Sequence, residues 1–201
     1  MSGEPGGRSK ATAKGDSPRF VVQRHDASSL HFDFRLEVDG VLKSWAVPKG
    51  PSTNPSDKRL AARTEDHPLD YAEFEGRIPE GQYGAGTVIV WDTGSYRNLT
   101  ERDGRPVPVG RAIEEGHLTV WLEGEKLVGG FALTKAKLRG GEQWLLVKKD
   151  DEGADRRHKP TRTQLTSVLS GRTNEDLDNV ADRQTGDESD DGTGHHPIPG
   201  R

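Results

Sequence analysis

The stretch that decides the fold occupies residues 30–38 and reads LHFDFRLEV. Its even positions are apolar and its odd positions are polar throughout, which is the two-residue period of a strand with one face on the core. The next two residues, Asp39 and Gly40, form a pair typical of a two-residue β-hairpin turn. Residues 41–47 then return as a second strand. The stretch therefore predicts an antiparallel hairpin whose even positions face the core.

The rest of the central region is also divided into short strands. Glycine and proline interrupt nearly every gap between them. Further strands are expected at 59–64, 87–92, 95–99, 117–123, 130–138 and 143–149. Helices are expected at 109–115, where Gly116 follows the last helical residue, and at 174–181. Many short strands with close turns predict a mainly β fold, either a barrel or a sandwich.

Apolar residues are concentrated in the middle of the chain. The 201 residues are 30% hydrophobic and 31% charged, and the central segment alone can build one compact core. We expect a disordered arm at 1–18 and one folded domain at 19–150. A C-terminal extension with a short helix is expected at 151–182, followed by an acidic disordered tail at 183–201.

Composition excludes several classes of protein. No apolar run approaches 18 residues, which excludes a transmembrane helix, and the first 20 residues lack the apolar segment of a secretory signal. The chain has no cysteine, which excludes disulfides, thiolate zinc sites and cysteine nucleophiles. A formal net charge of −4 argues against a protein that coats duplex DNA. The expectation is a cytoplasmic protein without a membrane partner.

The odd-numbered residues of the strand expected at 30–38 include candidate metal ligands. His31, Asp33 and Arg35 project to the same side. His25 lies six residues upstream of His31, before a turn-forming run at 26–29 that can bring the two histidines together. Two imidazoles and one carboxylate can occupy one face of an octahedral ion and suit manganese or ferrous iron. The alternative is that His31 only forms hydrogen bonds on a hydrated sheet face.

A second polar cluster follows at 59–71. If this segment is extended, one face carries Arg59, Arg63, Glu65 and His67. Pro68 ends the strand, because proline cannot donate to a ladder, and leaves His67 at the strand end. Lys49 lies in a rigid Pro-Lys-Gly context that suits a phosphate oxygen. The alternatives are an exposed strand-end histidine and an ordinary surface lysine.

The glycine-rich stretch 74–87 has neither of the spacings that mark nucleotide-binding loops. Its glycines are expected to serve tight turns. The four tryptophans fall in expected strands and are expected to pack in the core or at its edge rather than to serve as base-stacking platforms.

Several segments, taken together and in order, resemble the 3′-phosphoesterase domain of bacterial DNA ligase D. They are residues 23–36, 45–51, 65–71, 74–86 and 123–133. The resemblance implies that 19–150 forms a single closed or nearly closed β-barrel with one or two short helices. It also implies a manganese-dependent DNA 3′-end-processing activity. Members of the family remove a 3′-terminal ribonucleotide and then hydrolyse the remaining 3′-phosphate to a 3′-hydroxyl. With no polymerase or ligase segment after it, the chain is expected to be a stand-alone member.

The resemblance also implies roles for individual residues. His25, His31 and Asp33 would bind Mn²⁺. His67, Arg35 and Tyr71 would be catalytic, Lys49 and Arg59 would bind phosphate, and Gln23 and Glu65 would support them. The expected partners are DNA primer–template 3′ ends and a separate repair ligase or polymerase, in a nucleoid-associated location.

Two other functions are compatible with the residues. His31 and Asp33 form the short arm of a non-haem iron oxygenase triad, which a distal His67 or His117 would complete. Arg35, Lys49 and Arg59 suit phosphate better than a 2-oxoacid. The other alternative is a non-catalytic nucleic-acid-binding module with a structural ion.

Overall fold

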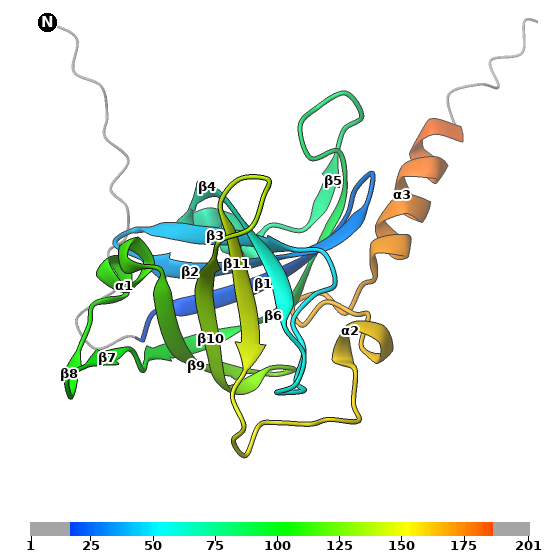
Figure 1. Cartoon of the computed structure of the whole chain (residues 1–201). Helices are drawn as coiled ribbons and strands as arrows, with labels where there is room; N and C mark the ends of the chain where they lie inside the picture. Colours follow the sequence, from blue (N-terminus) through cyan, green and yellow to red (C-terminus); the bar gives the residue numbers. More distant parts are fainter. Residues whose placement is uncertain (1–16, 187–201) are drawn as a thin grey trace, which may run out of the picture.

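The structure, a computed structural model, describes residues 17–186. The expected arm, except for its last two residues, and the tail beyond 186 lie outside the described residues. Eight antiparallel strands close into a barrel (Figure 1). In order around the barrel they are β1 (Arg19–Asp26), β2 (Leu30–Val38), β3 (Val41–Val47), β4 (Arg59–Pro68), β11 (Gln143–Lys148), β10 (Val128–Ala136), β9 (His117–Gly124) and β6 (Gly86–Asn98).

Shorter elements decorate this barrel. Strand β5 (Gly76–Ile78) adds to β6, and β7 (Glu101–Arg102) pairs with β8 (Arg105–Pro106). The helical elements are the 3-10 helix η1 (Leu69–Glu73), α1 (Val109–Glu115), α2 (Pro160–Thr163) and α3 (Asn174–Gly186). No helix in the described range is both long and apolar enough to span a membrane.

The predicted hairpin is confirmed as β2 and β3, with Val38 opposite Val41. Asp39 and Gly40 both have positive φ, at 49° and 83°, as a tight primed turn requires. The helix predicted at 109–115 is α1, and Gly116 ends it in the left-handed conformation with φ 86°. The mainly β, closed-barrel prediction is therefore confirmed.

Some boundaries differ from those expected. The strands predicted at 87–92 and 95–99 are one continuous strand, β6, and the C-terminal helix extends to 186 rather than 181. Strand β1 was not anticipated. Its sequence RFVVQRHD does not alternate, because the strand lies between β2 and β6 and is buried on both faces over most of its length.

The barrel interior holds most of the aromatic residues. Trp45, Trp91 and Trp144 are fully buried, and the rings of Trp45 and Trp144 meet edge to face with centroids 5.7 Å apart. Trp121 is not part of this interior: it is only half-buried and donates its indole N–H to Glu123. Core packing thus accounts for three of the four tryptophans.

The outer face of β2 is not the hydrated face that its alternation suggests. Asp33, Arg35 and Glu37 are only 6%, 3% and 7% exposed. A second, smaller apolar cluster lies outside the barrel, where Leu69, Tyr71 and Ala72 of η1 pack against strand residues Val21, Leu42 and Val90. This outer layer covers the polar row on β2 and turns it into the floor of a pocket.

Candidate active site

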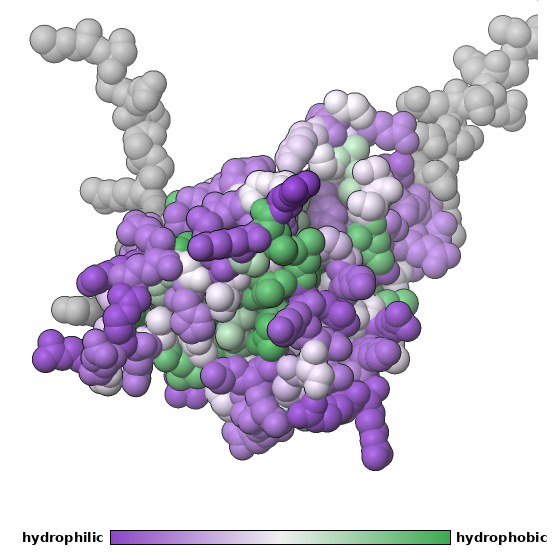
Figure 2. Space-filling view, in the orientation of Figure 1, coloured by the Kyte–Doolittle hydropathy of each residue, from purple (hydrophilic) through white to green (hydrophobic). Residues whose placement is uncertain are grey.

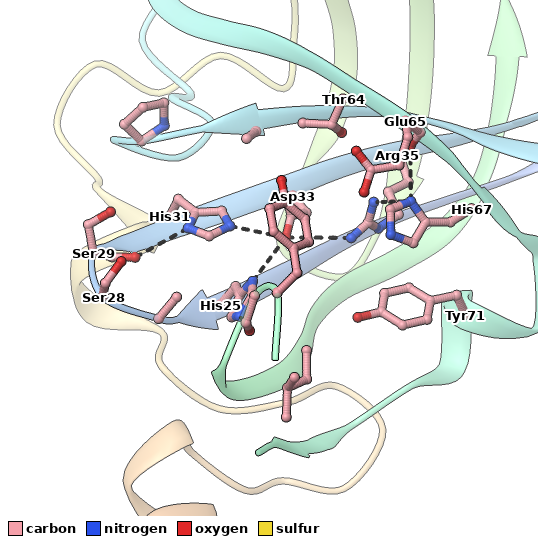
Figure 3. Close-up of a pocket in the computed structure, with 16 residues that line it drawn as sticks. His25, Ser28, Ser29, His31, Asp33, Arg35, Thr64, Glu65, His67 and Tyr71 are labelled. Carbon is pink, nitrogen blue, oxygen red and sulfur yellow. Dashed lines mark hydrogen bonds and ion pairs between the residues drawn. The ribbon is translucent and has the colours of Figure 1, made fainter. Parts of the chain in front are cut away.

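One pocket gathers most of the predicted site residues on the outer face of β1, β2 and β4. Its volume is about 450 Å³, within the range of about 300–1,000 Å³ that is usual for small-ligand sites. Its lining includes His25, His31, Asp33, Arg35, Glu65, His67 and Tyr71 (Figure 3). The two-residue period of β2 aligns His31, Asp33 and Arg35. His25 joins them because β1 pairs with β2 in a register that places His25 opposite His31.

His25, His31 and Asp33 converge at one end of this pocket. His25 Nδ1 lies 3.6 Å and His31 Nε2 3.3 Å from Asp33 Oδ2. The ligand atoms of all three residues lie within 4.8 Å of one another. This spacing lets one ion contact all three.

Backbone carbonyls fix the orientation of both imidazole rings. His25 Nε2 donates to the carbonyl oxygen of Gly84 over 2.6 Å, and His31 Nδ1 donates to that of Ser29 over 3.2 Å. A carbonyl oxygen can only accept, so the other nitrogen of each ring faces Asp33, where it can donate a proton to the carboxylate or offer a lone pair to a metal ion. Metal-binding histidines are typically held in this way. The donor set, two imidazoles and one carboxylate, fits a divalent transition metal.

The charge state of Asp33 favours a cation at this point. Burial raises the pKa of Asp33, but hydrogen bonds with His25 and His31 and the positive charge of Arg35 outweigh burial and lower it overall. Asp33 in turn raises the pKa of His31 by accepting a hydrogen bond from it, against the effect of burial. The carboxylate is therefore ionised, and a proton or a metal ion beside it is stabilised.

Arg35 occupies the other end of the pocket and is held on several sides. Its Nε donates to Gln23 Oε1 over 2.7 Å, and its Nη1 donates to Ser44 Oγ over 2.9 Å. Its Nη2 lies 3.5 Å from Asp33 Oδ2, and its guanidinium carbon lies 5.1 Å from the centre of the Tyr71 ring. These contacts fix the guanidinium plane before any ligand binds.

His67 lies against Arg35 near the end of β4, as predicted. Its Nδ1 is 3.1 Å from Arg35 Nη1 and 3.0 Å from the backbone oxygen of Glu65. Burial, and then the charge of Arg35, lowers the pKa of His67, so the neutral ring is favoured at pH 7. Its Nε2 has no hydrogen-bond partner within residues 17–186 and is free to exchange a proton with a ligand.

Tyr71 completes this end of the pocket. Its ring stacks on Phe74 with centroids 5.0 Å apart and lies 4.8 Å from the His67 ring. Burial raises the pKa of Tyr71, so the phenol keeps its proton and is available as a donor.

Gln23 and Glu65 differ in how they relate to the pocket. Gln23 is fully buried behind it, where its Nε2 donates to the backbone oxygens of Tyr71 and Phe74 while its Oε1 accepts from Arg35. Gln23 thus joins β1, β2 and η1. Glu65 is exposed, lines the pocket, and contacts His67 through its backbone oxygen.

Lys49 and Arg59 do not lie in this pocket. They line a second one, which shares only Pro48 with the first and has further basic residues His158, Lys159 and Arg162 on its wall. Arg59 begins β4, eight residues before His67, a separation of roughly 26 Å along an extended strand. The two predicted phosphate-binding residues are therefore together, but away from Arg35 and His67.

Sequence reasoning missed several contacts that shape the site. Ser44 was predictable, because the Asp39-Gly40 turn fixes a register that pairs it with Arg35. No pattern in the sequence indicates the roles of the Gly84 and Ser29 carbonyls or of the basic residues at 158–162. The two distal histidines considered for an iron-oxygenase triad do not join His31 and Asp33, because His117 contacts Thr134 and His67 contacts Arg35. The third member of the cluster is His25 instead.

Known proteins with similar sequences point to one family. A family model described as the DNA ligase D 3′-phosphoesterase domain matches residues 23–135, more than half of the chain. A multifunctional non-homologous end joining protein LigD of Pseudomonas aeruginosa is 52% identical over 174 residues, which is 85% of this chain and 20% of that protein.

Two mycobacterial proteins are also similar. The corresponding LigD protein of Mycolicibacterium smegmatis is 44% identical over 139 residues, 69% of this chain and 18% of its own length. The non-homologous end joining DNA repair protein LigD of Mycobacterium tuberculosis is 47% identical over 131 residues, 65% of this chain and 16% of its own length. The chain thus spans about a fifth of the length of these relatives.

Proposed function

Because the chain belongs to the DNA ligase D 3′-phosphoesterase family, we propose that it is a manganese-dependent hydrolase that repairs DNA 3′ ends. Its substrates are primer strands that end in a ribonucleotide or in a 3′-phosphate, and its product is a 3′-hydroxyl. The observation that carries this proposal is one pocket in which His25, His31 and Asp33 adjoin Arg35 and His67.

His25, His31 and Asp33 would hold the Mn²⁺ ion. A divalent cation there would screen the phosphate charge, polarise a phosphoryl oxygen and lower the pKa of a bound water. The protein supplies the orientation: the Gly84 and Ser29 carbonyls keep both imidazole lone pairs directed at the same point.

Arg35 and His67 act on the phosphate itself. The guanidinium of Arg35, fixed by Gln23 and Ser44, stabilises negative charge on the nonbridging oxygens. His67 either protonates the leaving oxygen or donates to a nonbridging oxygen, using its unpaired Nε2. Tyr71 donates a hydrogen bond from its phenolic O–H to the same phosphate.

Lys49 and Arg59 bind a different phosphate of the same strand. Their pocket adjoins the first at Pro48 and carries additional basic residues, Lys159 and Arg162. A backbone phosphate several nucleotides from the terminus would reach this pocket, whereas the reacting phosphate is held by Arg35. These contacts set affinity rather than the rate of the chemical step.

The 3′-hydroxyl product is what a polymerase or ligase needs. We therefore place the activity before repair synthesis or strand joining, with the joining enzyme supplied as a separate partner at the nucleoid.

The test uses a 5′-labelled primer–template that ends in one ribonucleotide, incubated with and without Mn²⁺, with products resolved by length and terminal group. A primer ending in a 3′-phosphate tests the second step. The expected result is manganese-dependent loss of the ribonucleotide and then of the phosphate. Protein carrying Asp33→Asn is the control for contaminating nucleases. If the wild-type protein leaves both primers intact in Mn²⁺, the proposed function is wrong.

A further inference from the structure

The loop at 79–85 joins β5 to β6 at the rim of the pocket. The pair Ile78–Gly86 closes it, and two turns shape it: Gln82 N donates to the Pro79 oxygen over 3.3 Å, and Ala85 N donates to the Gln82 oxygen over 3.1 Å. Gly81 and Gly84 have φ of 82° and 76°, a conformation that glycine adopts without strain. The loop therefore has a defined shape of its own.

This loop is also tied to the metal-binding end of the pocket. The Gly84 oxygen accepts the proton of His25 Nε2 over 2.6 Å. A Cβ atom at Gly84 would lie 3.4 Å from His25 Cε1, so the backbone approaches the imidazole ring closely. The position of residue 83 is consequently fixed relative to the predicted metal ligands.

Tyr83 is the residue that this loop presents. It lines the pocket and yet is 89% exposed, more than any other large hydrophobic residue that the structure describes. Tyr71, in the same pocket, is packed against Phe74, His67 and Arg35. Tyr83, in contrast, has no hydrogen-bond, ring or charge partner within residues 17–186. A large aromatic ring left in water at the mouth of a site has free surface for a ligand.

Resting on the proposed function, we propose that Tyr83 is the stacking platform for the base of the strand's terminal nucleotide. One sugar ring joins this base to the reacting phosphate, so the base leaves the pocket at the rim where Tyr83 stands. Stacking on an aromatic ring accepts every base, because each has a π-face. That tolerance is what an enzyme needs if it must process ends of any sequence.

A nucleobase fits Tyr83 better than a protein partner does. The surface shown in Figure 2 is mostly hydrophilic apart from an apolar area at its centre, and the residues on either side of Tyr83 are Gln82 and Gly84. Protein-docking sites need a contiguous apolar patch rather than a single ring. A ring that borders the proposed phosphate-binding groups and stands alone in a short loop of mostly small and polar residues matches the sugar–base unit of a nucleotide.

The test removes the aromatic ring of Tyr83 from the protein and the terminal base from the primer, each alone and both together. Wild type, Tyr83→Ala and Tyr83→Phe are assayed with Mn²⁺ on two primers, one ending in an ordinary ribonucleotide and one ending in a ribose without a base. Base–aromatic stacking predicts a loss of roughly 5- to 100-fold in kcat/KM when wild type meets the baseless end, mainly through KM. Tyr83→Ala should show the same loss on the ordinary end and no further loss on the baseless end. Tyr83→Phe should behave as wild type does.

A second measurement does not depend on turnover. A primer with a terminal 2-aminopurine is bound in the absence of metal, and its fluorescence is compared among the three proteins. Wild type and Tyr83→Phe should change the fluorescence, and Tyr83→Ala should not. If wild type binds this end but hydrolyses neither primer, the proposed function fails while the stacking role stands.

The stacking proposal itself has clear contrary results. It is overturned if Tyr83→Ala discriminates between the two primers as strongly as wild type does. It is also overturned if the substitution changes neither KM nor fluorescence, an outcome that would assign the ring to a protein partner. Manganese titration of Tyr83→Ala should give the wild-type affinity, which separates loss of stacking from damage to the nearby metal ligands.

Discussion

The two ends of the candidate active-site pocket, which both lie on the same face of β2, differ in how completely the protein itself holds their side chains. At one end, His25 and His31 each turn one ring nitrogen toward the Asp33 carboxylate and donate from the other nitrogen to a backbone carbonyl. At the other end, Arg35 donates to Gln23, Ser44 and His67, and is fully supported by the protein. The first end offers the ligands for a cation, and the second is held in place by the protein itself.

Under the proposed function, this difference lets a short row of residues act on one phosphate. Only one residue separates Asp33 from Arg35 on β2, so a phosphate in the pocket would contact the proposed cation at one end and the guanidinium at the other. The two ends should therefore fail differently when they are mutated. Loss at the first end removes the metal, and loss at the second removes turnover while the metal stays.

The largest effect is expected at the metal-binding end. Asp33→Asn keeps the size of the side chain but removes its charge, so both hydrolytic steps should fall on the order of 10³-fold or more, since a catalytic metal contributes several kcal/mol. Single-turnover assays on both primers measure this, and circular dichroism checks the fold. Turnover within tenfold of wild type would show that the carboxylate does not hold the metal.

The next largest effect is expected from His67→Ala. General acid–base participation is worth about 10²–10⁴-fold, and both the ribonucleotide-removing and the phosphate-removing steps should slow. Rates at saturating Mn²⁺ and DNA check this, because added metal should not rescue the variant. Rescue by excess Mn²⁺ would move His67 to the metal-binding end.

Gln23→Ala should have an intermediate effect through Arg35. The substitution leaves Arg35 Nε without its partner inside the protein, whereas the backbone oxygen of Tyr71 loses one donor and keeps the Phe74 N–H. An unpaired buried group costs about 1–3 kcal/mol, so the free energy of unfolding should fall by this order in urea titrations. Turnover should fall less than in His67→Ala. Wild-type stability would show that water replaces the amide without cost.

The smallest effects are expected in the second pocket. Lys49→Ala and Arg59→Ala should each raise KM by about tenfold and reduce the dependence of log KM on log salt by about one unit, as loss of one phosphate contact does. Lys58→Ala is a matched control, because Lys58 is exposed and lines neither pocket. A large fall in turnover at saturation would instead place Lys49 or Arg59 on the reacting phosphate.

The sequence predicted what depends on local geometry. The alternation at 30–38 and the turn at Asp39 and Gly40 place His31, Asp33 and Arg35 on one face and pair Arg35 with Ser44. The burial of that face was not predictable, because it depends on η1 packing across strands from three parts of the chain. The second pocket depends on Thr53, which donates to the backbone oxygens of Asp155 and His158 more than 100 residues later. Tyr83 was passed over because its glycine-rich surroundings predicted only turns.

The division of the pocket into two ends is tested most directly by titrating Mn²⁺ calorimetrically into wild type, His31→Ala and His67→Ala under identical conditions. We expect His31→Ala to lose manganese binding and His67→Ala to retain the wild-type affinity while losing turnover. Equal loss of manganese in both variants, or full retention in His31→Ala, would contradict it.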